Sequence, residues 1–542
     1  MIKYLKCCFI LVIFFFSNTF NAFALDINDN WKLFITSEQA LIHNKAGGAG
    51  RANSYLYLGN NGWNHLGRLD LLNRGTFDDV VYEIDLDTRL TSDARLDADD
   101  ASPKKIYLQR QSPETLLRVG DFYGNFSQYS LSQNLKGLIF SLEGSEENPW
   151  SFTTLGGTYK PRWEQVWKDE ESELKDTYFY GTRIGREKGS LKAHFNYVFT
   201  DEFRMGGVDE NTSRASTDIV HNNLLSFDWN FRPVSGLDLS GENSISKYHT
   251  TVRDNTDWGN AHRVLGRFRV KQLRTQLEYE RTPSDFHTPG GSASSDRARY
   301  RIRNNYYLGE HEVFFNHTNY HDNTQETLAT TTHVDSPELG FTARNLLNRR
   351  TLSSTVRIIH RRLYQEDHSQ DERTDTITYS MEDRFGPFRP ALEYEFRKVN
   401  PRKDENDSGE KTQAITLRGN SYHRNDIWTI RPSLAVRFEQ TEDKGAAGAR
   451  GTNKNLIWTG GISGDFKKDL RFNLASTISR ADNYVLDADT ARRTVRASLD
   501  YNIGGNRDNV LGFEYEGNSN SYSLNDTDYH EKIWKMKWTR RF

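Results

Sequence analysis

The feature that most constrains the fold is a repeated arrangement of two strand-like segments, joined by a short turn and followed by a longer polar loop. It runs from about residue 137 to the end of the 542-residue chain. Nine short turns are expected, at Arg186 to Gly189, Pro233 to Gly236, Val270 to Gln272, Leu308 to Glu310, Leu346 to Asn348, Gly386 to Pro387, Arg424 to Asp426, Phe466 to Asp469 and Gly504 to Arg507. Their centres recur about every 40 residues. Each repeat holds two long strands, whereas a propeller blade would need four short ones, so we expect an antiparallel up-and-down sheet.

Within these segments apolar and polar side chains alternate with a period of two, which is typical of a strand with two different faces. In the segment 428–438 one face carries Trp428, Ile430, Leu434, Val436 and Phe438. The segments 273–280 and 495–503 alternate in the same way. A two-layer sandwich also alternates, but its loops show no strict short-long order. Here all the short turns fall on one side, and the chain also ends on that side.

The last strand-like stretch carries aromatic and apolar residues of one parity up to the final residue: Trp534, Met536, Trp538 and Phe542. This ending resembles the closing strand of Gram-negative outer-membrane β-barrels, although Arg540 stands where that family usually has an apolar residue. The resemblance implies an all-β, large transmembrane antiparallel up-and-down barrel in the cell outer membrane. It also implies that these four residues are the assembly signal read by the barrel-assembly machinery, and that the lipid bilayer surrounds the wall.

The number of strands follows from counting back from the C-terminus. Nine hairpins and the last strand are clear, a further hairpin pairs Gly137 to Leu142 with Ser151 to Tyr159, and Thr115 to Val119 adds a strand. The total is about 22, within a range of 18 to 26, and residues 115–542 are expected to form the barrel. A barrel of this size holds a water-filled lumen, a plug or a partner.

The first 24 residues are expected to be a signal peptide. Lys3 and Lys6 precede an apolar run, and Ala22-Phe23-Ala24 has the small-x-small pattern of a cleavage site. Both cysteines, Cys7 and Cys8, lie in this segment, which excludes disulfides, thiolate metal sites and covalently attached haem from the mature chain. The mature chain would carry 69 basic and 74 acidic residues, a formal charge of −5. We therefore expect no cofactor and no nucleic-acid partner.

Residues 25–114 form a β-rich N-terminal segment whose place is left open by the sequence. Trp31 to Ile42, Asn53 to Leu58 and Asp79 to Leu90 could be strands, and the last of these alternates clearly. The segment could supply the first strands of the barrel, a periplasmic domain or a plug inside the lumen.

The stretch Gly120 to Ser127, followed by Ser130, Leu131, Lys136 and Gly137, mixes glycines with aromatic residues between two strand-like segments. No Lys-Ser/Thr follows a GxxxxG, so it is not a phosphate-binding loop. It is expected to be either a structural loop or barrel corner, or a lumen-folded constriction or ligand contact.

The strongest indication of a functional site in the sequence is a ladder of cationic side chains. The residues predicted to line the lumen are Arg263, Arg267, Arg269, Arg274, Arg297, Arg299, Arg301 and Arg303. They would favour anions in a pore or dock an acidic partner. Alternatively Glu278, Glu280 and Glu312 neutralise them and stiffen the wall. Because Glu393, Glu395, Glu514 and Glu516 occupy other strands, the lumen is expected to be patchy in charge.

Catalysis finds little support, because the 15 histidines are scattered and no His-Glu-x-x-His motif occurs. We expect no enzyme. The favoured function is an outer-membrane channel that lets small polar solutes pass passively. Three alternatives stay open: a scaffold barrel around a periplasmic or multihaem electron-transfer partner, a plugged, energy-coupled transporter, and an adhesin or structural barrel.

Overall fold

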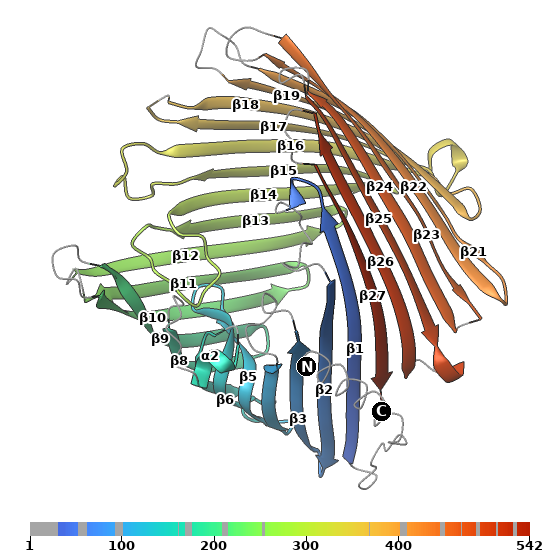
Figure 1. Ribbon diagram of the computed structural model, residues 1–542. Helices are drawn as coiled ribbons and strands as arrows, with labels where there is room; N and C mark the ends of the chain where they lie inside the picture. Colours follow the sequence, from blue (N-terminus) through green and yellow to red (C-terminus); the bar gives the residue numbers. More distant parts are fainter. Residues whose placement is uncertain are drawn as a thin grey trace.

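The structure is a computed structural model of the chain (Figure 1). It describes residues 31–51, 62–92, 101–160, 162–167, 176–208, 215–251, 255–367, 369–401, 409–444, 450–467, 469–483, 488–505, 508–523 and 528–541.

Nearly all of the described residues are in strands. The first half of the chain forms β1 (Trp31–Gly47), β2 (Gly62–Phe77), β3 (Val80–Thr91), β4 (Ala101–Gln111), β5 (Thr115–Ser127), β6 (Leu131–Leu142), β7 (Trp150–Thr158), the short helix α2 (Glu164–Trp167), β8 (Asp176–Lys188), β9 (Leu191–Val208), β10 (Ala215–Val234), β11 (Leu237–Thr250), β12 (Asn255–Val270) and β13 (Leu273–Thr282). The second half forms β14 (Arg297–Leu308), β15 (His311–His321), β16 (Thr332–Arg344), η2 (Leu346–Asn348), β17 (Ser353–Gln365), β18 (Asp371–Glu382), β19 (Phe388–Pro401), β20 (Glu410–Ser421), β21 (His423–Arg424), β22 (Trp428–Lys444), β23 (Arg450–Phe466), β24 (Leu470–Asn483), β25 (Ala488–Asn502), η3 (Ile503–Gly505), β26 (Asn509–Tyr522) and β27 (Tyr529–Arg541).

The strands form one closed antiparallel barrel. Each wall strand pairs with the next strand along the chain, and β21 is a two-residue strand beside β22. The barrel closes where β1 pairs with β27, from Thr36 opposite Arg541 to Gly47 opposite His530. Figure 1 shows this seam, with the blue β1 lying beside the red β27. The described residues thus form 26 wall strands, which is the upper end of the predicted range and four more than the favoured number of 22.

The predicted turns overlap the described connections at one end of the barrel. The connections at 189–190, 235–236, 271–272 and 309–310 are two residues long, and longer ones such as 283–296 and 322–331 alternate with them at the other end. We call the end with the two-residue connections the short-turn end and the opposite end the long-loop end. No helix among the described residues has the length and apolarity needed to cross a membrane.

The two faces of the wall differ as the alternation predicts. Large apolar side chains point outward and are exposed, among them Phe195, Leu225, Val264, Leu434 and Trp458. The opposite face is mainly polar and charged. An apolar outer surface around a polar interior is the arrangement that a lipid-embedded barrel requires.

The described part of the N-terminal segment lies in the wall. Strands β1 to β4 pair in sequence with one another, and β4 pairs with β5 from Tyr107 opposite Gly120 to Gln111 opposite Leu116. The described residues between 31 and 111 therefore do not form a plug. The stretch Asn53 to Leu58 lies outside the described residues.

Candidate functional site inside the barrel

Strands β5 and β6 leave the wall part-way along their length. They pair with each other from Thr115 opposite Leu142 to Ser127 opposite Leu131. However, β4 accompanies β5 only as far as Gly120, and β7 accompanies β6 only between Leu142 and Lys136. The remaining residues 121–135, called here the inner hairpin, are thus freed from both wall neighbours and contact residues of distant strands instead.

Two glycines lie where the hairpin leaves the wall. Gly120 and Gly137 are directly opposite each other in the β5–β6 register. Gly120 has a φ of +112°, and an added Cβ there would lie 2.1 Å from the carbonyl oxygen of Ile106. An added Cβ on Gly137 would lie 2.1 Å from the carbonyl oxygen of Gly156. Only glycine permits this backbone conformation and this close approach, so the pair fixes the position of the bend.

A buried ion pair lies next to this bend. Lys136 Nζ is 2.6 Å from Asp121 Oδ1, and the Lys136 side chain is only 6% exposed. Asp121 Oδ2 accepts hydrogen bonds from the backbone N–H of Ile106 at 2.7 Å and from Trp163 Nε1 at 2.6 Å. The carboxylate therefore satisfies a β4 donor at the place where β5 turns away. The further hydrogen bonds compensate for taking the charges out of water.

The underside of the inner hairpin is apolar and packs on an apolar part of the inner wall. Its buried side chains meet others from β7, β8 and β9 in one cluster: Phe122, Phe126, Leu131 and Leu135 from the hairpin, with Leu155, Phe179 and Val198 from the wall. Burying each such side chain contributes roughly 1.5–3 kcal/mol. The opposite side of the hairpin presents Tyr123 and Asn125, which are exposed.

A second segment, the loop 283–296 between β13 and β14, packs beside the tip of the hairpin. The N–H of Ser132 donates to the carbonyl of Gly290 at 2.7 Å, and the N–H of Ser292 donates to the carbonyl of Gln128 at 2.9 Å. Phe286 and Tyr129 are fully buried against each other, with ring centroids 5.7 Å apart. We call this loop the inner loop, and the inner hairpin and inner loop together the lumen insert.

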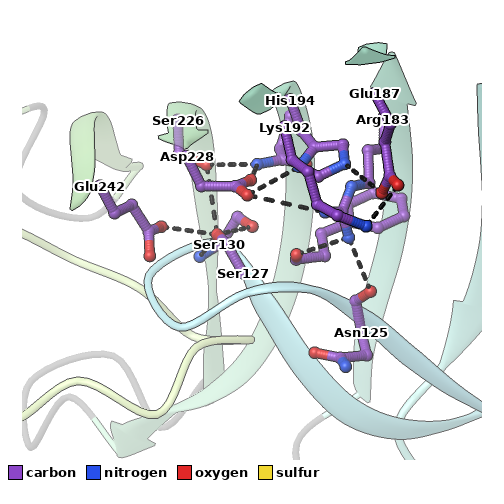
Figure 2. Close-up of polar contacts among 12 residues, drawn as sticks. Asn125, Ser127, Ser130, Arg183, Glu187, Lys192, His194, Ser226, Asp228 and Glu242 are labelled. Atoms are coloured by element: carbon purple, nitrogen blue, oxygen red, sulfur yellow. Dashed lines mark hydrogen bonds and ion pairs between the residues drawn. The ribbon is translucent and has the colours of Figure 1, made fainter. Parts of the chain in front are cut away.

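Glu242, a buried residue of β11, holds the tip of the inner hairpin. Its Oε1 accepts hydrogen bonds from Ser127 Oγ at 2.6 Å and from the backbone N–H of Tyr129 at 3.1 Å. Ser127 Oγ also lies 3.2 Å from Ser226 Oγ of β10. Figure 2 shows Glu242 and Ser226 reaching the hairpin from neighbouring strands. A buried carboxylate is tolerated only with such partners, so it favours the docked position of the tip.

Arginine and aspartate side chains of the wall support the other side of the tip. Arg183 Nη1 donates to the carbonyl of Phe126 at 2.7 Å, and its Nη2 lies 3.6 Å from Asp228 Oδ1. Asp228 also accepts from Asn196 Nδ2 at 2.8 Å and lies 2.8 Å from His194 Nδ1. Figure 2 shows Arg183, His194 and Asp228 reaching towards the hairpin tip from the wall strands. The tip is thus held directly by Arg183 of β8, Ser226 of β10 and Glu242 of β11, while His194 and Asn196 of β9 position Asp228.

Of the two interpretations of the Gly120 to Gly137 stretch, the lumen-folded arrangement is the one that the structure has. The wall residues that hold the tip of the inner hairpin, Glu242 above all, were not recognised from the sequence. The signal that could have found it is the row of small or polar residues on the inner face of β11, Ser240, Glu242, Ser244 and Ser246, in which one long carboxylate stands among serines.

The eight predicted lumen arginines lie on the face opposite to the exposed apolar residues Val264, Leu277 and Tyr300. Their surroundings differ along the barrel axis. Towards the long-loop end Glu278, whose side chain is 3% exposed, lies 3.1 Å from Arg263, 3.4 Å from Arg299 and 3.4 Å from Arg301. Glu280 pairs with Arg299 and accepts from Gln128 of the inner hairpin. These three arginines of the ladder are therefore neutralised internally.

The other five arginines of the ladder, Arg267, Arg269, Arg274, Arg297 and Arg303, are not bound by Glu278 or Glu280. The guanidinium of Arg274 lies over the ring of Tyr307 at 4.9 Å, and that of Arg297 lies over Tyr320 at 4.9 Å. Arg267 approaches a carboxylate only at 3.9 Å, that of Asp238.

The prediction that Glu312 neutralises the ladder was wrong. Glu312 Oε2 pairs instead with Arg344 of β16, at 3.1 Å, and its Oε1 accepts from Asn305 of β14. The reason is that the β14 residue opposite Glu312 is Tyr307, four positions beyond Arg303. Elsewhere on the lumen face Glu393 pairs with Arg418 and Glu516 pairs with Arg496, so these carboxylates are neutralised locally as well.

Three residues of the predicted assembly signal, Trp534, Met536 and Trp538, lie on β27 next to the seam. Trp534 and Met536 are exposed on the apolar outer face, whereas Trp538 is 9% exposed and donates from Nε1 to Asn509 Oδ1 at 2.7 Å. Phe542 lies outside the described residues. Recognition by the assembly machinery stays a prediction.

No protein-family model and no curated protein sequence matches the chain. Its fold is similar to that of solved structures. The outer membrane transporter YddB from Escherichia coli aligns at 8% identity over 94% of this chain and 80% of that chain, with a TM-score of 0.43. The siderophore receptor PirA from Pseudomonas aeruginosa aligns at 10% identity over 94% and 80%, with a TM-score of 0.40. The PapC translocation pore of the P pilus usher aligns at 8% identity over 94% and 98%, with a TM-score of 0.35.

The wall itself decides which kind of barrel this is. It is a closed antiparallel cylinder with an apolar outside, a polar inside and alternating short turns and longer loops. The fold is that of an outer-membrane β-barrel. The protein therefore resides in the outer membrane, with the lipid bilayer against its outer face. At 26 strands the outer-membrane barrel is wider than its own inward side chains can fill.

Proposed function

We propose that this outer-membrane barrel is a passive channel for small polar solutes, narrowed from within by the lumen insert. The observation that carries the proposal is the position of the described residues between 31 and 111. Because these residues form wall strands, the described part of the N-terminal segment supplies no plug domain. The inner face offers paired charges to water along most of its strands, which suits the passage of hydrated solutes.

The construction of the insert supports a fixed constriction. It turns its apolar side to the wall and leaves Tyr123 and Asn125 towards the lumen. Two apolar clusters and the bonds to Glu242 and Arg183 hold it at several separate points. A segment anchored in this way narrows the passage without needing a bound ligand or an energy source.

Single-channel conductance in a planar bilayer tests the proposal. The full chain is compared with a variant in which residues 122–135 are replaced by the turn Gly-Asn-Gly. We expect steady, ohmic openings from the full chain and a conductance larger by about twofold or more from the variant, because the narrowest part of a pore dominates its resistance.

Both proteins must first show the shifted gel mobility of a folded barrel. Equal conductance would show that the insert does not narrow the passage. Silence from both folded proteins would overturn the channel, and would favour instead a scaffold barrel filled by a periplasmic or multihaem partner.

A further inference from the structure

The short-turn end of the lumen contains a cavity rich in arginine. It has a volume of about 670 Å³ and is bordered by the turn 235–236 and the adjoining ends of β10 to β14. The charged residues that line it are Arg232, Arg267, Arg269, Arg274, Arg303 and Asp238. Five cations against one carboxylate give the lining a formal charge of +4. We call these six residues the arginine basin.

The basin differs from the rest of the ladder in its ion pairing. Asp238 is shared between Arg232 at 3.2 Å and Arg267 at 3.9 Å. Among the described residues, no carboxylate forms an ion pair with Arg269, Arg274 or Arg303. The same strands carry Glu278 and Glu280 only nearer to the long-loop end, where they are already bound by other arginines.

The strand register places the unpaired cations next to one another. Arg269 is directly opposite Arg274 on β12 and β13, and Arg303 on β14 is opposite Gln276, two positions along β13. Like charges that face each other across a strand pair are destabilising. No carboxylate in the described part of the wall neutralises these arginines, so a bound anion from solution would relieve their repulsion.

We propose that the arginine basin binds a small solute that carries two or more phosphate or carboxylate groups. Guanidinium groups bind both of these anions in a bidentate manner, and several of them converge here. The volume lies within the range of small-molecule sites. This inference rests on the proposed channel and adds the class of solute: multivalent anions are concentrated at the short-turn mouth of the lumen, which the strand topology places on the periplasmic side.

Isothermal titration calorimetry with inorganic pyrophosphate, on the full folded chain in detergent, tests the basin. The test variant is Arg269→Gln with Arg274→Gln. The control is Arg431→Gln with Arg471→Gln, which removes two cations at the same end of the barrel. In the control, however, both cations are paired with Asp465, at 3.1 and 3.2 Å.

We expect saturable binding by the unaltered chain, a Kd raised by about tenfold or more in the test variant, and little change in the control. The test variant removes a like-charge pair, so it should fold at least as well as the unaltered chain. Absence of saturable binding, or equal loss in both variants, would overturn the basin. Calorimetry needs no bilayer, so it tests the basin separately from the channel. If the protein binds pyrophosphate but conducts no current, the basin stands and the channel is overturned. If it conducts current but does not bind pyrophosphate, the channel stands and the basin is overturned.

Discussion

At the scale of single residues, the docked position of the inner hairpin depends on a few polar atoms at its tip. Glu242 accepts two hydrogen bonds from the hairpin, from the Ser127 hydroxyl and the Tyr129 N–H, and a third at 3.3 Å from Ser244 of its own strand. All three converge on one carboxylate oxygen. Removing its charge should therefore weaken the attachment without leaving a cavity.

The substitution Glu242→Gln tests this attachment. It keeps the size and one acceptor oxygen but loses the charge assistance of the bonds to Ser127 and Tyr129. We expect the free energy of local opening to fall by about 1.5 kcal/mol, which is about a tenfold faster amide exchange in residues 126–131. Hydrogen exchange followed by mass spectrometry measures it.

Glu516→Gln is the matched control, because Glu516 pairs with Arg496 on another part of the wall. It should leave the exchange of the hairpin unchanged. If Glu242→Gln also leaves the exchange unchanged, the carboxylate does not hold the tip.

At the scale of strands and turns, the sequence predicted the regular part of the barrel well. The short turns were predictable because glycine, proline and asparagine interrupt long stretches of period-two alternation. The strand β2 was not, since apolar residues occupy both parities in it, for example Leu66 and Leu72 on one and Leu69 and Leu71 on the other. The strand β4 was missed as well. It contains Pro103 and a register shift against β3 between Asp87 and Thr88, which break the alternation.

The lumen insert was harder to predict for a different reason. The residues Phe122 to Leu135 alternate as any wall strand would, and only Gly120 and Gly137 distinguish the place where the hairpin turns inward. Alternation tells which side chains share a face, but it does not tell whether that face meets lipid or another part of the wall. The apolar patch on β7, β8 and β9 that receives the hairpin becomes visible only when the strands are assembled.

The contact between the hairpin and β8 gives a prediction at this scale. A Cβ on Gly181 would lie 2.6 Å from a ring carbon of Phe126, too close for both to keep their positions. We expect Gly181→Ala to weaken the docking by about 1–3 kcal/mol through overpacking. Chymotrypsin should then cleave the hairpin after Tyr123 or Phe126 roughly tenfold faster, because cleavage follows the opened population.

The neighbouring strand offers a control of the same chemistry. A Cβ on Gly156 would meet its nearest atom, in Tyr180, at 3.5 Å, an ordinary contact. Gly156→Ala should therefore be cleaved at the rate of the unaltered chain. If chymotrypsin cleaves both variants at the same slow rate as the unaltered chain, the hairpin does not rest on β8 as described.

At the scale of the whole molecule, the first strand and the last strand complete the wall. Their twelve paired positions are supplemented by an ion pair of 2.9 Å between Lys537 and Glu38 on the inner face. An antiparallel barrel can close only with an even number of strands. Removal of a single strand should therefore prevent closure rather than make a slightly smaller barrel.

A chain that lacks residues 25–61, and with them β1, tests this requirement. We expect it to lose the heat-modifiable gel mobility that folded barrels show, because β2 and β27 run parallel and cannot pair in the antiparallel manner of the other neighbours. The unaltered chain run beside it is the reference. A folded, heat-modifiable product would show that β1 is dispensable for the wall.

The seam also sets an order on the folding of the chain. Thr36 meets Arg541, and these positions are 505 residues apart in the sequence, whereas the other wall contacts join neighbouring hairpins. Local hairpins can pair early, but contacts between the two ends must wait for the whole chain. Until the last strand arrives, the growing sheet has two open edges that can pair with other chains. The period between synthesis and insertion is therefore when this protein is most exposed to aggregation.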